Sequence, residues 1–213
     1  MKVNEETALK ISQNLLRIKA IKLNLKKPYT WASGWKSPIY CDNRITLSYP
    51  KIRTYIRQEF VKIINEDFGD IDLIAGVATA GIAHGALLAQ DLGLPFAYVR
   101  SSAKDHGLTN RIEGVVGSGQ SVIVIEDLIS TGGSSLSAVK ALREAGANVK
   151  GLFSIFSYGF EIADEKFNEA NCSVHSLSDY NYLIAQALAD EYIREEDMIV
   201  LKKWRENPAK WKK

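Results

Sequence analysis

Two adjacent carboxylates, Glu126 and Asp127, open a short run of small and hydroxylated residues. Each carboxylate can accept hydrogen bonds from hydroxyl groups of a ligand. The glycines in the segment 130–134 let backbone N–H groups turn inward, and a helix expected from Ser134 adds the positive end of its dipole. The run therefore predicts a site for a ligand with a phosphate at one end and neighbouring hydroxyls at the other, such as a ribose 5-phosphate.

Other phosphate-binding motifs do not fit this chain. It has no G-x-x-x-x-G-K-[ST] sequence, and Gly114, Gly117 and Gly119 are wrongly spaced for G-x-G-x-x-G. A strand, a Gly-Gly turn and a helix with two solvated acids would be the ordinary interpretation of Gly132 and Gly133 alone. The acids and hydroxyls beside them favour the phosphate site.

A second candidate segment is the long polar loop 101–119, which contains no large apolar residue that would anchor its first part. Arg100, Lys104 and His106 concentrate positive charge there. Loops of this length are usually functional or disordered. Beside a phosphate site the functional alternative is favoured, because a diphosphate leaving group needs cations that close over it and exclude water.

The elements that must position these residues alternate between strand and helix. Residues 122–125 are four apolar β-branched residues, typical of a strand buried on both faces of a parallel sheet. Ligands of such sheets bind at the carboxyl ends of the strands, where the acids stand. Further strands are expected at 21–25, 39–44, 73–77, 96–100, 151–157 and 173–177, and helices at 5–20, 50–67, 81–93, 134–145, 163–170, 180–192 and 195–203.

Composition excludes several classes of protein. The 213 residues are 46% hydrophobic and 24% charged, with a net charge of +2, as in an ordinary globular protein with one main domain. No basic stripe for nucleic acid, no secretory signal and no apolar run long enough for a membrane span is visible. Cys41 and Cys172 are too few for a disulfide framework and lack metal-site spacing, so we expect a reduced, cytoplasmic protein.

The chemistry-bearing segments resemble a known family. The run 122–135 is similar to the 5-phosphoribosyl 1-diphosphate (PRPP) motif of type I phosphoribosyltransferases. The series Arg100, Lys104, His106 and Gly107 resembles the R-x-x-x-K-x-H-G signature of the catalytic loop of orotate phosphoribosyltransferases. The segments 30–34 (TWASG) and 37–40 (SPIY) resemble the orotate-side segment of those enzymes, and 76–81 resembles their diphosphate-binding turn.

This resemblance implies a type I phosphoribosyltransferase fold of the α/β class, a central mostly parallel sheet flanked by helices. A helix and hood segment (1–45) would sit with a core (46–213) in one compact unit. The implied reaction joins orotate and PRPP to give orotidine 5′-phosphate and diphosphate, a step of UMP biosynthesis. Mg²⁺ would be coordinated by the substrate diphosphate and by water molecules rather than by a cage of protein ligands. The enzyme would be a homodimer with shared active sites, the loop 101–113 of one subunit closing over PRPP bound by the other.

The resemblance also implies roles for individual residues. Arg100, Lys104, His106 and Asp127 would be catalytic. The PRPP-binding residues would be Arg100, Lys104, His106, Glu126, Asp127, Leu128, Ile129, Ser130, Thr131, Gly132, Gly133 and Ser134. The diphosphate turn would comprise Ala78, Thr79 and Ala80, with a cis peptide between Ala78 and Thr79, and orotate would contact Tyr40, Cys41 and Ser130.

The chain departs from many members of the family at four places. Ser101, Ala32 and Ala80 stand where lysines are common, and no arginine near 157–160 matches the usual orotate contact. These departures leave open which residue holds the orotate carboxylate.

Two alternatives to the orotate enzyme are a purine-type phosphoribosyltransferase and a non-catalytic PRPP-sensing regulator that binds DNA. The orotate-like N-terminal segment speaks against the first, and the lack of room for a DNA-binding domain speaks against the second. Outside the motifs, we interpret His84 and His175 as structural, and Trp204 and Trp211 as packing residues rather than nucleic-acid stacking platforms.

Overall fold

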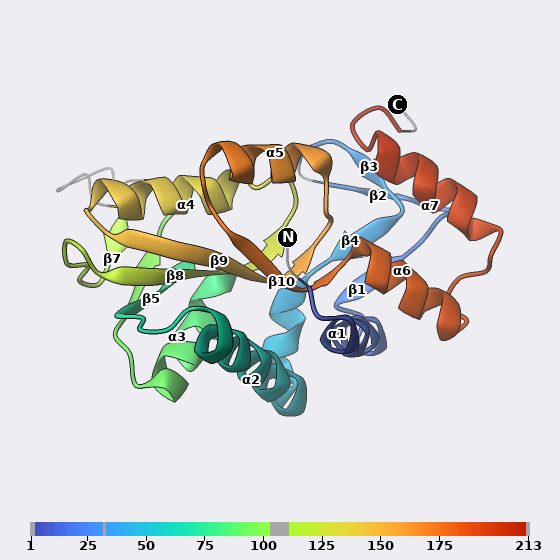
Figure 1. Ribbon diagram of the computed structural model, residues 1–213. Helices are drawn as coiled ribbons and strands as arrows, with labels where there is room; N and C mark the ends of the chain where they lie inside the picture. The colour runs from blue at the N-terminus through green and yellow to red at the C-terminus, as the bar shows by residue number, and fades with distance from the viewer. Residues whose placement is uncertain (1–2, 32, 103–110, 212–213) are drawn as a thin grey trace.

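A six-stranded sheet forms the centre of the protein in a computed structural model that describes residues 3–31, 33–102 and 111–211 (Figure 1). The strand order is β10-β9-β8-β5-β6-β7, and neighbours are parallel except for β7, which runs antiparallel to β6. The strands are β5 (Leu73–Val77), β6 (Phe96–Val99), β7 (Ile112–Glu113), β8 (Ser121–Ile129), β9 (Asn148–Ser157) and β10 (Val174–Asp179). The expected mostly parallel sheet is confirmed.

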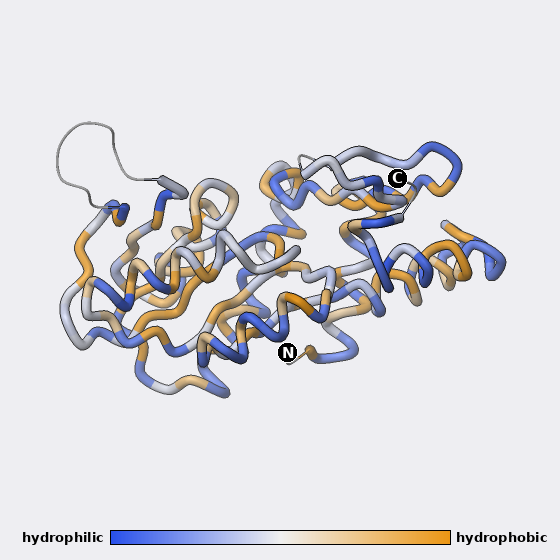
Figure 2. Tube along the Cα trace, turned by 90° about the horizontal axis from the view of Figure 1, so that it is seen from above, coloured by the Kyte–Doolittle hydropathy of each residue, from blue (hydrophilic) through white to orange (hydrophobic). Residues whose placement is uncertain are grey.

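Helices cover both faces of this sheet, because its central strands are apolar on both sides. In β8, Ile123 and Ile125 join one hydrophobic core while Val122 and Val124 join the other. The first core is shared with α1 (Glu5–Arg17), α2 (Pro50–Asp67) and α3 (Ala80–Leu92), and the second with α4 (Gly133–Glu144) and α5 (Glu161–Glu169) (Figure 1). Figure 2 shows hydrophilic and hydrophobic residues alternating along the helices, as expected for helices that pack one face on the sheet.

Short strands and the C-terminal helices lie together at the right of Figure 1. The strands β1 (Ile21–Leu23) and β4 (Ile39–Cys41) pair antiparallel, as do β2 (Tyr29–Thr30) and β3 (Lys36–Ser37). They are accompanied by α6 (Tyr180–Ala189) and α7 (Asp197–Glu206). Trp204 of α7 is fully buried, and its indole N–H donates to the Lys36 carbonyl over 3.2 Å. The C-terminal helix therefore supports the N-terminal segment, and the packing role expected for Trp204 is confirmed.

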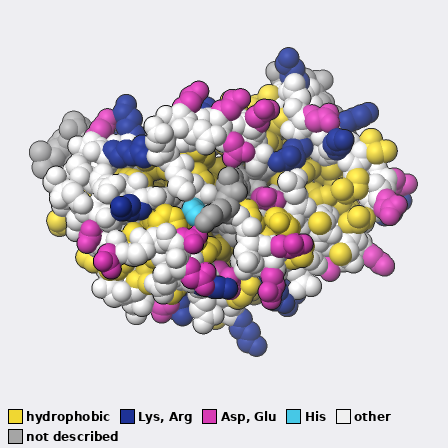
Figure 3. Space-filling model, in the orientation of Figure 1, with side chains coloured by type: hydrophobic (Ala, Val, Ile, Leu, Met, Phe, Trp, Pro, Cys, Tyr) yellow, Lys and Arg dark blue, Asp and Glu magenta, His cyan; other side chains and the backbone are white. Residues whose placement is uncertain are grey.

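A hydrophobic groove runs between α5, α6 and α7, and Figure 3 shows hydrophobic side chains gathered over α6 and α7. Its volume is about 1240 Å³. Ile199 at its margin is 63% exposed. Neither Glu126 nor Asp127 lines this groove.

Several strand boundaries differ from expectation by one to four residues, and two of these differences lie at the candidate site. The strand expected at 39–44 ends at Cys41 and is followed by the 3₁₀ helix η1 (Asn43–Ser48). The Asp42 carboxylate accepts hydrogen bonds from the backbone N–H of Arg44 at 3.3 Å and from its guanidinium at 2.6 and 2.9 Å, which caps this helix. The strand expected at 122–125 continues to Ile129, because its pairing with β9 extends that far.

Candidate functional site

The two candidate carboxylates lie on a part of β8 that pairs with β9 on one side but no longer with β5 on the other. The register of β8 with β5 ends at the pair Gly76 and Ile125, whereas its register with β9 continues to Ile129 and Ser157. Glu126 and Asp127 follow Ile125 directly. They are therefore held by a strand on one side and are open to other segments on the side where β5 has ended.

Glu126 is buried and fixed by the first turn of α4. Its Oε2 accepts hydrogen bonds from the hydroxyls of Ser134 at 3.3 Å and Ser135 at 3.1 Å, and its Oε1 accepts the Asp127 N–H at 3.2 Å. Burial raises the pKa of Glu126 from its usual 4.5 to about 8, with a smaller contribution from the Asp127 charge. Burial also raises the pKa of Asp127. Ser135 is a contact that the sequence did not indicate.

The raised pKa of Glu126 predicts a pH-dependent stability. A carboxyl group whose pKa is raised on folding stabilises the protein fully below its unfolded value, 4.5, and this contribution is lost as the pH rises through about 8. We therefore expect the free energy of unfolding of the wild type to fall relative to that of Glu126→Gln between about pH 4.5 and about pH 8. Urea unfolding at several pH values measures this difference, and parallel curves for the two proteins would contradict it.

The candidate phosphate loop follows β8 and leads into α4. Gly132 adopts φ 75°, a left-handed conformation that favours glycine, and a Cβ there would lie 2.9 Å from the Phe167 ring. The side chain of Ile129 is buried, and its carbonyl accepts the Tyr158 N–H at 2.9 Å. Ile129 belongs to the core shared with α4 and α5, and Leu128 packs against the core shared with α1, α2 and α3. Of the expected PRPP-binding residues, 130–132 thus form the turn itself, Gly133 and Ser134 begin α4, and Leu128 and Ile129 belong to the strand that carries the turn.

Two of the three diphosphate-turn candidates line a separate cavity of about 470 Å³ together with the start of the polar loop, whereas the third, Ala80, begins α3 and is not among the lining residues. Ala78, Thr79 and Arg100 are among its lining residues, and the peptide between Ala78 and Thr79 is cis, as expected. Arg100 Nη1 lies 3.7 Å from Glu113 Oε1 and makes no hydrogen bond within the described residues. The structure thus brings the turn and the first cation of the loop to one cavity.

The two ends of the loop are clamped to each other. The Arg111 guanidinium donates to the Arg100 carbonyl at 3.0 and 2.8 Å and to the Ser137 hydroxyl at 2.9 Å. The Arg100 N–H in turn donates to the Arg111 carbonyl at 2.8 Å. Lys104 and His106, the other two expected loop cations, lie outside the described residues. Arg111 was not expected to have this role.

Glycines bring the diphosphate turn directly against β8. A Cβ at Gly81 would lie 2.3 Å from the Ile125 carbonyl oxygen and 3.4 Å from the Glu126 Cα, and one at Gly76 would lie 2.9 Å from the Gly81 oxygen. Such approaches are possible only without a side chain. The turn at 78–81 and the carboxylates therefore belong to one site.

We expect Gly81→Ala to lower the free energy of unfolding by about 1–3 kcal/mol, because its methyl group forces the α3 N-terminus away from β8. Gly117→Ala serves as the matched control, since its Cβ would meet only the Gln120 side chain at 3.4 Å. Thermal or urea unfolding compares the two variants. Equal stabilities would show that the turn can move without cost.

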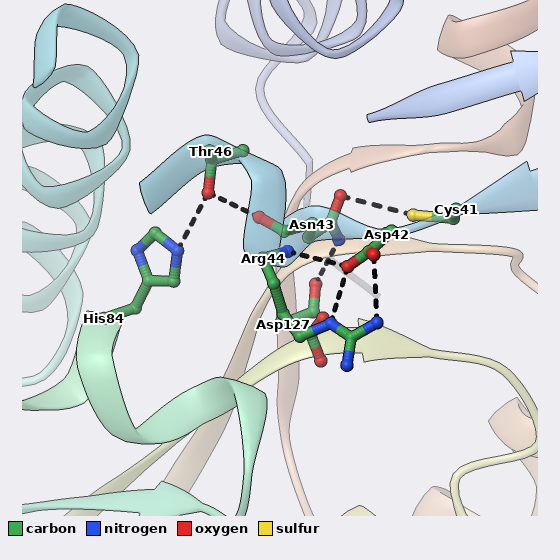
Figure 4. A network of polar contacts seen from close by, with 7 residues as sticks. All are labelled: Cys41, Asp42, Asn43, Arg44, Thr46, His84 and Asp127. Carbon is green, nitrogen blue, oxygen red and sulfur yellow. Dashed lines mark hydrogen bonds and ion pairs between the residues drawn. The ribbon is translucent and has the colours of Figure 1, made fainter. Parts of the chain in front are cut away.

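Cys41, one of the expected orotate-side residues, is connected to Asp127 through Asn43 (Figure 4). Cys41 Sγ donates to Asn43 Oδ1 at 3.2 Å, and Asn43 Nδ2 donates to the Asp127 carbonyl at 2.7 Å. Burial, followed by the charges of Asp127 and Asp42, raises the pKa of the Cys41 thiol well above its usual value. Of the other two candidates, Tyr40 is 37% exposed, and Ser130 lies directly after β8.

Tyr158 joins this group, although sequence patterns did not indicate it. It is 2% exposed and packs against Trp31, with ring centroids 4.9 Å apart. Burial raises its pKa well above the usual value, and Cys41, Tyr40 and Asp127 raise it further, so its hydroxyl shares their surroundings. This residue stands in the segment 157–160, where no arginine is present.

The remaining candidates are structural. His84 is buried, its Nε2 lies 3.0 Å from Thr46 Oγ1, and burial lowers its pKa to about 4. His175 stacks on Phe153 with ring centroids 5.1 Å apart. Within the described residues, no three or more His, Cys, Asp or Glu side chains are grouped to hold a metal ion. None of the described helices combines the length and the apolar character that crossing a bilayer requires.

Comparison with known proteins agrees with this geometry. A family model described as "Phosphoribosyl transferase domain" matches residues 47–176. The orotate phosphoribosyltransferase of Phocaeicola vulgatus is 55% identical over 94% of both chains, and that of Cytophaga hutchinsonii is 49% identical over 100% of both. The crystal structure of orotate phosphoribosyltransferase from Aeropyrum pernix, 24% identical, covers 86% of this chain and 99% of its own with a TM-score of 0.75, which supports the fold. The family resemblance seen in the motifs is thereby confirmed, and the chain belongs to the orotate phosphoribosyltransferase family.

Proposed function

We propose that the protein transfers the 5-phosphoribosyl group of PRPP to orotate, giving orotidine 5′-phosphate and diphosphate. The observation that carries this proposal is the contact of Gly81 with Ile125, which joins the candidate diphosphate turn to the candidate ribose carboxylates. The family membership indicates that the substrate base is orotate, since relatives that match nearly the whole chain are orotate phosphoribosyltransferases.

Each part of PRPP has a matching segment in this proposal. The 5-phosphate accepts hydrogen bonds from backbone N–H groups of the turn 130–134, where the N-terminus of α4 adds positive potential. Asp127 and Glu126 accept hydrogen bonds from the ribose hydroxyls. The diphosphate lies against Ala78, Thr79 and Ala80 and the cations Arg100, Lys104 and His106.

In the reaction, the bond between ribose C1′ and the diphosphate oxygen breaks, a bond to orotate N1 forms, and the proton of N1 is released to solvent. The leaving diphosphate takes the bonding electron pair, so negative charge grows on it while the ribose gains positive character. Arg100, Lys104 and His106 stabilise the first charge, and Asp127 lies close to the second. Positioning of N1 against C1′ supplies the rest of the rate enhancement.

We also propose Mg²⁺ as the cofactor. Mg²⁺ prefers oxygen ligands and keeps several of its waters, so oxygens of the substrate diphosphate and waters would fill most of its coordination positions. When bound, the ion would neutralise charge on the diphosphate. The protein's own residues would orient that group rather than enclose the metal.

On the base side, Tyr40, Cys41 and Ser130 would contact orotate, and the protein would act in the cytoplasm as a homodimer. Support for the base side comes from the hydrogen bonds that connect Cys41 with Asp127 through Asn43. Both cysteines are free, as a reducing compartment would keep them.

A spectrophotometric assay of base consumption with PRPP and Mg²⁺ tests the function directly. We expect orotate to be consumed and hypoxanthine and adenine to be left unchanged. Consumption of a purine base would favour the purine-type enzyme. PRPP binding without turnover of any base would favour the regulator.

A further inference from the structure

Asn43 supplies the hydrogen bond that β8 lacks once β5 has ended. It is fully buried at the start of η1, and its Nδ2 donates to the Asp127 carbonyl at 2.7 Å (Figure 4). The register of β5 with β8 ends at Ile125. An amide side chain from a segment 84 residues away thus takes the place of a neighbouring strand at the residue proposed to hold the ribose.

Asn43 is itself held at two further points, one on its side chain and one on its backbone. Its Oδ1 accepts the Cys41 thiol at 3.2 Å, and the Asn43 backbone carbonyl accepts the Thr46 hydroxyl at 2.5 Å. Because the single Thr46 proton is used in that bond, the contact of Thr46 Oγ1 with His84 Nε2 at 3.0 Å requires the histidine to donate. Burial keeps His84 neutral by lowering its pKa to about 4, so the ring is the Nε2-protonated tautomer.

We propose that Asn43 is a positioning residue that fixes Asp127 relative to the orotate-side segment at Tyr40 and Cys41. The inference rests on the proposed function, which assigns the ribose to Asp127 and the base to Cys41. The Asn43 side chain contacts both Cys41 and Asp127. It therefore sets the distance between the residue proposed to contact orotate and the residue proposed to hold the ribose of PRPP. Thr46 and His84 act behind it by holding η1 in place.

This role separates rate from stability. A displacement of about 1 Å between reacting groups can cost about a hundredfold in rate. If the buried amide served only the fold, its removal would lower the melting temperature and leave the kinetics of the folded enzyme unchanged. The distinction therefore lies in kcat and in the KM for PRPP.

The experiment compares Asn43→Ala with Thr46→Val and Thr46→Ser. The valine removes the hydroxyl that holds the Asn43 carbonyl, and the serine keeps it. Ser12→Ala is the matched control, because Ser12 Oγ makes a buried hydrogen bond with Ser178 Oγ at 2.7 Å between α1 and β10. For each variant, kcat, both KM values, the PRPP dissociation constant from calorimetry and Tm are measured.

We expect Asn43→Ala to lower kcat/KM for PRPP by at least about tenfold, Thr46→Val to lower it by less, and Thr46→Ser to restore it. Ser12→Ala should lower Tm without this kinetic loss. Wild-type kcat/KM in folded Asn43→Ala, or a loss that follows Tm equally in all variants, would overturn the proposal. If Asn43→Ala does not fold, equal kcat/KM for Thr46→Val and Thr46→Ser overturns it. A wild type that binds PRPP but leaves orotate unchanged refutes only the proposed activity, since the PRPP dissociation constants still test Asn43.

Discussion

Lys104→Ala should raise the activation free energy of the reaction by about 2–4 kcal/mol while changing orotate affinity little. A cation aimed at the departing diphosphate gains most when charge grows there, so its loss appears in kcat more than in binding. Lys104 lies outside the described residues, but the loop that carries it starts at Arg100, which lines the cavity of the diphosphate turn. Steady-state kinetics with both substrates varied measures the effect.

Lys140→Ala provides the control for the loss of a lysine. Lys140 is exposed on α4, and its Nζ lies 3.7 Å from Oε1 of Glu144, one helical turn away. Exposed pairs of this kind contribute little to stability. If Lys104→Ala turns over at nearly the wild-type rate, Lys104 has no part in the mechanism.

Local sequence patterns were sufficient to predict the frame of the site. The β-branched run before Glu126 and the turn after it predicted a central strand and its loop, because hydrophobic burial and glycine conformations are local properties. The end of β8 was misplaced by four residues, since its length is set by pairing with β9 and not by its own residues. The contact of Gly81 with Ile125 also requires the folded sheet.

Contacts between distant segments were not predictable. Asn43 was assigned to a strand, and nothing in its neighbours indicates that its amide reaches Asp127. Arg205 of α7 donates to the Gly159 carbonyl at 2.7 Å, beside the segment where an orotate-contacting arginine was sought. Such pairs depend on how helices and strands pack, which periodicity does not encode.

Active sites shared between two subunits should be detectable by mixing inactive variants. The loop joins β6 to β7, and β7 is the edge strand of the sheet, so the described ends of the loop lie at the sheet's margin. We propose that it closes over PRPP bound by a second copy of the chain. Lys104→Ala supplies a defective loop with an intact carboxylate pair, and Asp127→Asn supplies the reverse.

After subunit exchange, the mixture should regain up to about a quarter of wild-type activity, because about half the dimers are mixed and each of those holds one intact site. Differently tagged subunits verify the exchange, and each variant exchanged with itself gives the background. If tags show complete exchange and activity stays at that background, each loop closes over its own subunit's substrate. Recovery therefore distinguishes a dimer that completes the site from one that only brings two complete sites together.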